Sequence, residues 1–386
     1  MNRPINIVFL HRGGAQIRGS EQALLAILDG LDPTQFRASV VCSNEAMGVP
    51  LEARGIEWHA QQFPELLPSL RHMRLPIVGY VHALRRIIRH CRSRRADIIV
   101  SNGGGPCQLG VPAARWTRVP IACLFYHPAP AKYHRYWLTK RVDRTIFASQ
   151  FTATSTHASA GFAGEVVYVG VDAEQRLRPR PRDDEARARL GFRPEHVVFG
   201  QVGALVPHKG HDITIEAFAL VARAMESARL VIVGAGPEEA RLRVWVEERD
   251  LADRIVFTGY VDDTLPFFQS IIDVNVLASH EEGLGLVNLE ASACERPNVA
   301  TDGTGIRETI EHGRTGYLFP DGDVRALAEY MERLGRDDAL RQTMGTEGRE
   351  MVLRRFSSRT YAARVQAILR SVLADHEVGM TPTGHA

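Results

Sequence analysis

The sequence predicts an α/β protein built from two doubly wound domains. In both halves of the chain, short apolar runs typical of buried parallel strands alternate with amphipathic segments typical of helices. A polar, proline-bearing stretch over residues 174–190 separates the halves and indicates a linker. With 386 residues, 45% of them apolar, the chain is long enough for two hydrophobic cores. We therefore expect a first domain over residues 1–173 and a second over residues 191–355.

The first domain begins with a strand, a loop, a helix and a second strand. Apolar runs predict strands over residues 5–10 and 38–42, and leucines at helical spacing predict a helix over residues 22–31. The loop after the first strand contains Gly14 and Gly19. Glycine lacks the Cβ that would block the approach of a diphosphate or an acceptor. Loop glycines also form plain turns, and both interpretations stay open.

Two further strands bring loops to one edge of the predicted sheet. They cover residues 97–100 and 120–125, and His127 lies two residues after the second. Ligands bind at the carboxyl ends of the strands in open α/β sheets. His127 is therefore a candidate ligand-contacting residue, and the alternative is an ordinary loop histidine.

The second domain begins with a strand that ends at Gly203, followed by a loop that contains Lys209. A lysine ammonium is a compact positive charge that suits phosphate. Gly234 and Gly236 form half of a dinucleotide-binding fingerprint, but its third position is Glu239, so we interpret them as a turn. The strands expected in this domain cover residues 196–203, 230–234, 254–259 and 274–278.

The most informative stretch runs from Ser279 to Glu290. It follows a predicted strand and continues into a helix expected over residues 286–294. A strand, a glycine-bearing turn and a helix together offer backbone N–H groups to an anion. Two carboxylates, Glu282 and Glu290, flank seven intervening residues. A carboxylate accepts two hydrogen bonds, which suits vicinal sugar hydroxyls. The alternative is a helix start with surface glutamates.

This stretch resembles the E-x7-E signature of the retaining glycosyltransferases of family 4. Three other motifs are similar to the family's in order and spacing: Gly203-x5-Lys209-Gly210, Phe257-x-Gly259-Tyr260-Val261 and Gly313-x-x-Gly316. The resemblance implies the GT-B fold, in which two Rossmann-like domains face each other across a cleft. It also implies that a C-terminal helix, here over residues 356–375, crosses back to pack on the N-terminal, acceptor-side domain.

The resemblance implies a hexosyltransferase that moves a sugar from a nucleotide-sugar donor, UDP- or GDP-linked, to an acceptor hydroxyl with retention of configuration. Cell-surface glycan, glycolipid or glycoconjugate synthesis is the implied setting, with a sugar or lipid-linked acceptor.

The implied catalytic residues are Glu282, which holds sugar hydroxyls, and His127. Lys209 would contact the diphosphate and Glu290 the ribose. No metal ion or other cofactor is implied. The remaining implied donor-binding residues are Gly203, Gly283, Leu284, Gly285, Leu286, Val287, Gly259, Tyr260, Val261, Gly19 and Gly14.

One position departs from the family pattern. The family usually has an arginine five residues before the lysine, where this chain has Ala204. A lost charge-assisted contact to phosphate would weaken donor binding. Arg307, Arg12 or Arg18 could supply the charge instead. Two alternatives to an active transferase therefore stay open: a catalytically silent sugar-nucleotide-binding subunit and a sugar-nucleotide epimerase of the same fold.

Charge is unevenly distributed along the chain. Residues 1–175 contain 20 Lys and Arg against 12 Asp and Glu, and the remainder contains 27 against 33. Arg85, Arg89 and Arg92 fall on one face of a predicted amphipathic helix, and aromatic residues are not interleaved with them. This pattern fits contact with an anionic membrane or acceptor, or a solvated helix face, and it argues against nucleic acid.

The sequence carries no obvious targeting or metal signal. Five scattered cysteines without a C-x-x-C pair indicate neither a zinc site nor a disulfide framework, and fit reduced thiols. The first residues lack the apolar length of a signal peptide, and no run is long enough to span a membrane. We therefore expect a cytoplasmic protein, with peripheral contact at the inner face of the cell membrane as an open possibility.

Overall fold

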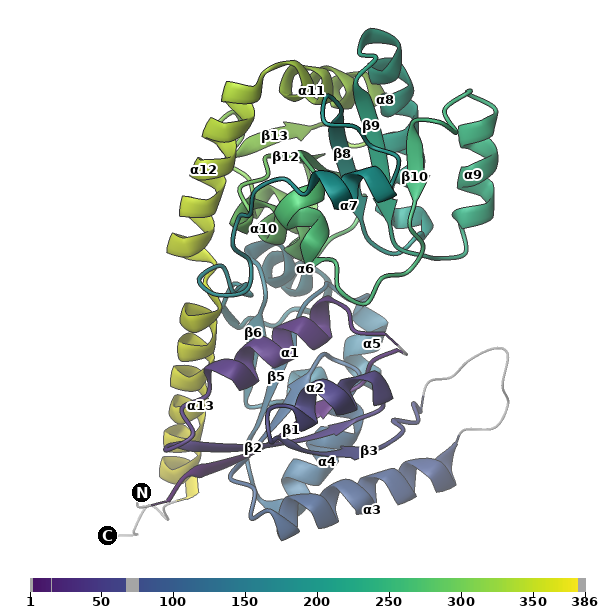
Figure 1. The fold of residues 1–386 in the computed structure, drawn as a ribbon. Coiled ribbons are helices and arrows are strands. Elements are labelled where there is room, and N and C mark those ends of the chain that lie inside the picture. The colour runs from purple at the N-terminus through teal and green to yellow at the C-terminus, as the bar shows by residue number, and fades with distance from the viewer. Residues whose placement is uncertain (1–2, 15, 67–75, 381–386) are drawn as a thin grey trace. The chain divides into compact units, whose positions relative to one another are not determined.

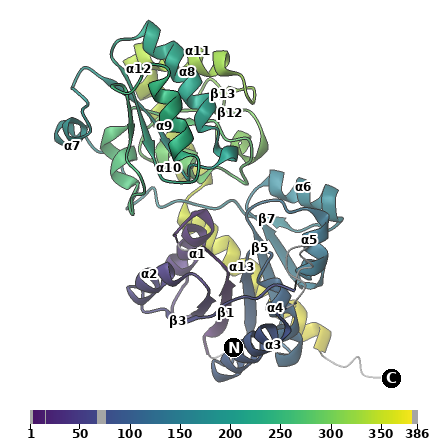
Figure 2. The same cartoon turned by 90° about the vertical axis from the view of Figure 1, so that its right-hand side faces the viewer.

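The computed structural model describes residues 3–14, 16–66 and 76–380. The chain divides into two compact units, one formed by Met1–Gly170 with Ser358–Ala386 and the other by Val171–Ser357. Each unit is an α/β body with one parallel sheet, as Figures 1 and 2 show. The predicted fold class is therefore confirmed.

The sheet of the first unit has the strand order β3-β2-β1-β4-β5-β6-β7. All its pairs are parallel, and the central strands are almost continuously buried, as expected when helices cover both faces. The order reverses between β1 and β4, so the loops after these two strands meet at a topological switch point. The strands are β1 (Ile5–His11), β2 (Phe36–Cys42), β3 (Glu57–Ala60), β4 (Ile98–Asn102), β5 (Ile121–Phe125), β6 (Arg144–Phe147) and β7 (Glu165–Val166).

Two pairs of helices pack together in this unit. Helices α3 and α4 contact each other and share a core with β1, whereas α1 lies beside the C-terminal helix α13 (Figure 1). The C-terminal helix thus belongs to the first unit. The helices are α1 (Gly19–Gly30), α2 (Gly48–Glu52), α3 (Ile77–Ser93), α4 (Cys107–Thr117), α5 (Ala131–Tyr136), α6 (Gln150–Ala160) and α13 (Ser358–Met380), with short 3-10 turns η1 (Glu45–Met47) and η2 (Thr139–Arg141).

The sheet of the second unit has the order β10-β9-β8-β11-β12-β13, again parallel throughout. Its order reverses between β8 and β11, so a second switch point lies at their carboxyl ends. The strands are β8 (Val197–Val202), β9 (Ala228–Val233), β10 (Ile255–Phe257), β11 (Val274–Leu277), β12 (Asn298–Thr301) and β13 (Gly316–Phe319).

The helices of the second unit also pack in pairs, α8 with α11 and α10 with α12. The first pair covers the main core of this unit, which contains Phe199, Phe218 and Phe319. The helices are α7 (Asp184–Arg189), α8 (His211–Ala224), α9 (Glu239–Glu247), α10 (Leu286–Ala293), α11 (Val324–Arg336) and α12 (Asp338–Arg355), with short turns η3 (Pro207–Lys209), η4 (Phe267–Ile271) and η5 (Thr304–Glu308).

The stretch expected to be a linker, residues 174–190, is instead part of the second unit. It contains α7, whose Arg187 is fully buried. Arg187 forms an ion pair with Asp273, with Nη1 and Oδ1 3.1 Å apart, and donates a hydrogen bond to the His196 carbonyl oxygen. Composition alone suggested a linker because it could not reveal that Arg187 has a buried partner.

Two other features concern the organisation of the chain. Edge strand β3 was not predicted from the sequence, because only four residues form it and its burial is partial. In the described ranges, no helix combines the length and hydrophobicity that a transmembrane span requires.

Candidate functional site

The switch point of the second unit brings Lys209 and Glu282 together. Strands β8 and β11 are hydrogen-bonded neighbours, and Lys209 and Glu282 lie in the loops that follow them. The Lys209 ammonium forms an ion pair with Glu282 Oε1, and the Ser279 hydroxyl donates a 3.1 Å hydrogen bond to the same oxygen. The backbone N–H of His280 donates to the His208 carbonyl oxygen at 2.9 Å, which ties the two loops together.

Exposure differs between the two partners of this ion pair. The Glu282 side chain is 9% exposed and that of Lys209 is 22% exposed. Glu282 is thus almost enclosed, whereas the ammonium can reach an incoming anion.

The signature stretch forms the predicted strand, turn and helix. Strand β11 is buried throughout, and Gly285, with φ of +85°, provides the left-handed residue that begins α10. Leu286 and Val287 form the first turn of α10, where backbone N–H groups lack acceptors within the helix. The Gly305 N–H donates to the Glu282 carbonyl oxygen at 3.0 Å, so η5 supports the loop from the other side. This geometry suits an anion.

Two buried polar side chains, Gln201 and His211, lie next to the lysine loop. The Gln201 amide donates to the Lys209 carbonyl oxygen at 2.7 Å. His211, the first residue of α8, is buried, and among the described residues neither of its ring nitrogens has a hydrogen-bond partner. Burial, with the nearby charge of Lys209, lowers the pKa of His211 to about 4. His211 is therefore neutral at physiological pH and adds no charge to the site.

Glu290 lies on α10 and is partly buried. Burial raises its pKa from 4.5 to about 7; Arg176 opposes this rise and Asp263 adds to it. Arg176 and Asp263 form an ion pair, with Nη2 and Oδ1 3.2 Å apart. A carboxyl group with this pKa titrates near neutral pH. Ligand hydroxyls that donate hydrogen bonds to it would favour its ionised form.

A second polar cluster lies at the switch point of the first unit. His11, the last residue of β1, bonds to Glu21 through Nε2 at 2.9 Å and to the Asn102 amide through Nδ1 at 2.8 Å. Burial by itself raises the pKa of Glu21, but the hydrogen bond and charge of His11, helped by Ser20, lower it to about 2. His11, Glu21 and Asn102 are all buried. Such a hydrogen-bonded network restrains these three side chains, and Glu21 also accepts a 3.1 Å hydrogen bond from the Arg18 N–H in the adjacent loop.

Sequence reasoning missed this cluster and chose other glycines of the loop. A Cβ at Gly13 would lie 2.1 Å from Glu21 Oε1, whereas a Cβ at Gly14 would meet no atom within 4 Å. Gly13 is thus the position at which the cluster requires glycine. The available signal was that His11 and Asn102 end the two strands that flank the switch point.

Comparison with known proteins decides the family. The pattern described as "Glycosyl transferases group 1" matches residues 182–351, and that described as "Glycosyltransferase Family 4" matches residues 17–175. The "Putative glycosyltransferase EpsD" of Bacillus subtilis is 30% identical over 294 residues, which cover 75% of this chain and 73% of EpsD. The chain belongs to glycosyltransferase family 4.

Other proteins are similar over part or all of the chain. A GDP-mannose-dependent α-(1-6)-phosphatidylinositol monomannoside mannosyltransferase of Mycobacterium tuberculosis is 34% identical over 241 residues, which cover 59% of this chain and 62% of that enzyme. The crystal structure of HepE from Anabaena, in complex with UDP and glucose, superposes with a TM-score of 0.82 at 21% identity, covering 95% of this chain and all of HepE. The latter likeness shows the GT-B fold.

The residues implied by membership of family 4 are divided between the units. Lys209, Glu282, Glu290 and the turns around them lie in the second unit. There Gly203 follows β8 with φ of +158°, and Gly259 follows β10 with φ of +71°. Tyr260 is half exposed and Val261 is partly buried. The signature residues Gly283 and Leu284 are buried in the loop before α10.

The other implied residues lie in the first unit. His127 is exposed two residues after β5, Gly14 is exposed in the loop after β1, and Gly19 is the first residue of α1.

Ala204, where family 4 usually has arginine, lies in the same unit as one candidate substitute. Arg307 of η5 is exposed and forms two bonds to Asp302, from Nε to Oδ1 at 2.7 Å and from Nη2 to Oδ2 at 2.9 Å. It follows Gly305, which contacts the glutamate loop. Arg12, another candidate, belongs to the first unit and is ion-paired with Glu65.

Proposed function

We propose that this protein is a glycosyltransferase that moves a sugar from a nucleoside diphosphate donor to an acceptor hydroxyl with retention of anomeric configuration. The observation that carries this proposal is the contact between Lys209 and Glu282 beside the N-terminus of α10. One cation, one carboxylate and the N–H groups of a helix's first turn are what a sugar diphosphate requires. The nucleotides named for the relatives, GDP-mannose and UDP, support a nucleotide-sugar donor.

Each group has a distinct role in this proposal. The Lys209 ammonium and the N–H groups of Leu286 and Val287 balance the charge that develops on the leaving diphosphate, so a metal ion is not required. Glu282, freed from Lys209 by the competing phosphate, accepts hydrogen bonds from sugar hydroxyls. Glu290 accepts from the ribose hydroxyls, and residues 259–261 line the base.

The reaction exchanges one bond at the anomeric carbon for another. The bond from this carbon to the diphosphate oxygen breaks with both electrons leaving on oxygen, and the acceptor oxygen bonds to the carbon from the same face. The acceptor proton passes to the departing phosphate oxygen. His127 orients the acceptor, because an imidazole can bond to a hydroxyl as donor or acceptor.

A panel of UDP-, GDP- and ADP-sugars tests this function. The base is identified first by thermal shift, since a ligand bound only by the folded protein raises its stability. Each matching donor is then incubated with the protein and with sugar or lipid-linked acceptors. Release of nucleoside diphosphate with a product that keeps the donor's anomeric configuration supports the proposal. Inversion, or interconversion of the free donor sugar, contradicts it.

A catalytically silent nucleotide-binding subunit is the second candidate, and Ala204 is the observation that favours it. Such a subunit would show a thermal shift with a nucleotide but no release of nucleoside diphosphate from any donor. The two candidates therefore differ in turnover and not in binding.

We further propose that helix α3 contacts an anionic membrane. Arg85, Arg86, Arg89 and Arg92 are exposed on it, while Ile87 is buried in the core of the first unit. Arginines on an exposed helical face attract anionic headgroups.

The first turns of α3 add exposed apolar surface. Val78 is 71% exposed, Ile77 is 56% exposed and Val81 is 36% exposed. These side chains can enter the headgroup region while the arginines bind its charges. A lipid-linked acceptor would then lie in the same membrane.

A further inference from the structure

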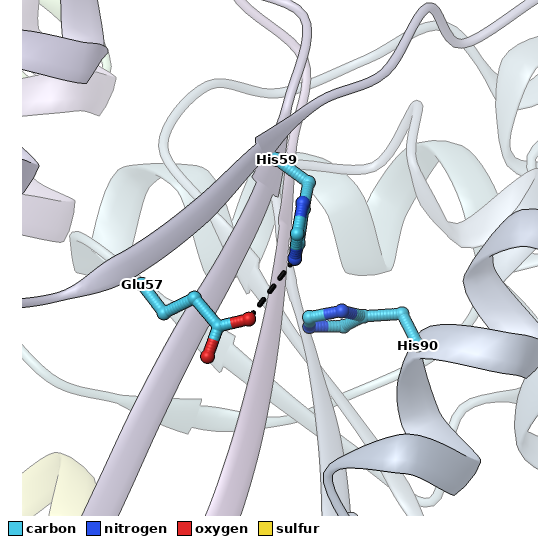
Figure 3. Close-up of side chains that lie close together, drawn as sticks. All are labelled: Glu57, His59 and His90. Carbon is cyan, nitrogen blue, oxygen red and sulfur yellow. Dashed lines mark hydrogen bonds and ion pairs between the residues drawn. The ribbon is translucent and has the colours of Figure 1, made fainter.

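A group of three side chains outside the unit that holds the candidate donor site has the composition of a metal site. Glu57 and His59 lie on edge strand β3, and His90 lies on α3. One ligand atom from each of the three lies within 4.8 Å of the others. Figure 3 shows the three side chains converging from the strand and the helix. All of them belong to the first unit, whereas Lys209 and Glu282 belong to the second.

The local fold explains why these residues meet. Glu57 and His59 are two positions apart on a strand, so both side chains point to the same face of the sheet. Glu57 Oε1 and His59 Nε2 are 3.0 Å apart. Helix α3 contributes to the same core as the sheet, and His90 meets His59 edge to face, with ring centroids 4.8 Å apart.

Ser39, on the neighbouring strand β2, also contacts this group. Ser39 on β2 is paired in register with Glu57, and its hydroxyl bonds to His90 Nε2 at 2.9 Å. Ser39 is buried, so this bond fixes the orientation of the His90 ring. Metal-binding histidines are usually oriented by such a partner on one ring nitrogen.

We infer that Glu57, His59 and His90 form a binding site for a zinc-class divalent cation that ties β3 to α3. Two imidazoles and one carboxylate are ligands that zinc accepts readily, whereas magnesium and calcium prefer oxygen. Three protein ligands leave a fourth position for water, and the side chains of His59 and Glu57 are 53% and 35% exposed, so the cation can enter. The site strengthens an edge strand that has a sheet neighbour on one side only.

The ion pair between Arg94 and Glu57 competes with a bound cation for the Glu57 carboxylate. The Arg94 guanidinium forms an ion pair with Glu57 Oε1, the same oxygen that faces His59. A divalent cation must displace it. Arg94 is at the end of α3 and its side chain is 47% exposed, so it can move into solvent. Removing Arg94 should therefore strengthen cation binding.

The test is calorimetric titration of the full-length protein with ZnCl2 after treatment with a chelator. The wild type should bind one zinc ion tightly, and His59→Gln and His90→Gln should each lower the affinity at least about tenfold. His82→Gln, an exposed histidine on the same helix, is the matched control and should bind as the wild type does. Glu57→Gln provides a third ligand variant in case His90→Gln does not fold.

Two further measurements complete the test. Zinc should raise the melting temperature of the wild type and the control but not that of the ligand variants. Arg94→Ala should bind zinc more tightly than the wild type. Zinc affinity and melting shift that are unchanged in His59→Gln and Glu57→Gln would overturn the inference. So would magnesium competing on equal terms, or Arg94→Ala binding no more tightly.

Discussion

Lys209 and Glu282 lie 73 residues apart in the sequence, yet their side chains form an ion pair at the carboxyl ends of β8 and β11. The pair joins the lysine loop to the glutamate signature and holds both charges where a donor would need them. Because Glu282 is almost enclosed, removing Lys209 leaves a carboxylate supported mainly by Ser279. Such a change costs about 1–3 kcal/mol in general, so binding tests of this site need a stability control.

Lys209→Ala should weaken binding of the nucleoside diphosphate by about tenfold to a hundredfold and leave binding of the nucleoside nearly unchanged. The reason is that the lost contact is a charge-assisted bond to phosphate. Calorimetry with both ligands measures the two effects. The double variant Lys209→Ala/Glu282→Gln, in which no carboxylate is left unpaired, should recover stability but not diphosphate affinity. Equal losses for nucleoside and diphosphate would indicate a folding defect.

The raised pKa of Glu290, about 7, predicts how the free energy of unfolding depends on pH. Below about pH 4.5 the carboxyl group is protonated in both the folded and the unfolded state. Between about 4.5 and 7 the folded protein retains a proton that the unfolded chain has released, so this group's contribution to stability falls as pH rises. Glu290→Gln removes that fall. Urea unfolding at about pH 4.5 and about pH 8 measures the free energy of unfolding of both proteins. The free energy of the variant relative to that of the wild type should be higher at pH 8 than at pH 4.5. A difference between the two proteins that does not depend on pH would contradict the assignment.

Ionised Glu290 should also favour the nucleotide. If it accepts from both ribose hydroxyls, the affinity ratio of wild type to Glu290→Gln should increase as pH rises through about 7. The ligand's own phosphate titrates in the same way with both proteins, so its effect on affinity cancels in the ratio. A ratio that stays flat would remove Glu290 from the ribose site.

Arg307 should supply part of the positive charge missing at Ala204. Arg307→Ala should weaken diphosphate binding about tenfold, equivalent to roughly 1.4 kcal/mol, and adding Ala204→Arg should restore it. Arg314→Ala is the matched control, because Arg314 is another exposed, ion-paired arginine of the same unit. If neither Arg307→Ala nor Ala204→Arg changes affinity, the missing arginine is not compensated at this position.

Helix α3 should bind vesicles that contain anionic lipid and not neutral vesicles. Each arginine near such a surface contributes on the order of 1 kcal/mol, so reversing Arg85, Arg89 and Arg92 should lower partitioning by about a hundredfold or more. Cosedimentation at low and high salt measures this, and donor hydrolysis should be unchanged. A control that reverses Arg189, Arg193 and Arg325, exposed in the second unit, should still bind. Equal binding to both lipid types would contradict the membrane contact.

Local sequence patterns predicted the fold class and the strand, turn and helix of the signature stretch. Strand β11, Gly285 and α10 follow from an apolar run, a glycine and helical spacing, all within about twenty residues. Lys209 and Glu282 were singled out through the family resemblance, and the pairing of β8 with β11 brings their loops together. The features that sequence reasoning missed depend on packing between distant segments, which no local pattern encodes.

Three groups of residues show contacts between distant segments that the sequence did not reveal. Arg187 is buried only because Asp273 lies beside it. The requirement for Gly13 exists only because Glu21 and His11 occupy the space around it. Glu57, His59 and His90 meet only once α3 packs on the sheet, and a search of cysteine spacing for metal sites does not detect such a group.

The most direct test of the proposed transferase site is turnover by Glu282→Gln. With the donor selected by the nucleotide panel, initial rates of nucleoside diphosphate release should be at least about tenfold lower than in the wild type, equivalent to roughly 1.4 kcal/mol of transition-state stabilisation. Glu281→Gln, the exposed neighbour, should retain the wild-type rate. Wild-type turnover by Glu282→Gln with an unchanged Michaelis constant for the donor would contradict the assignment of this site.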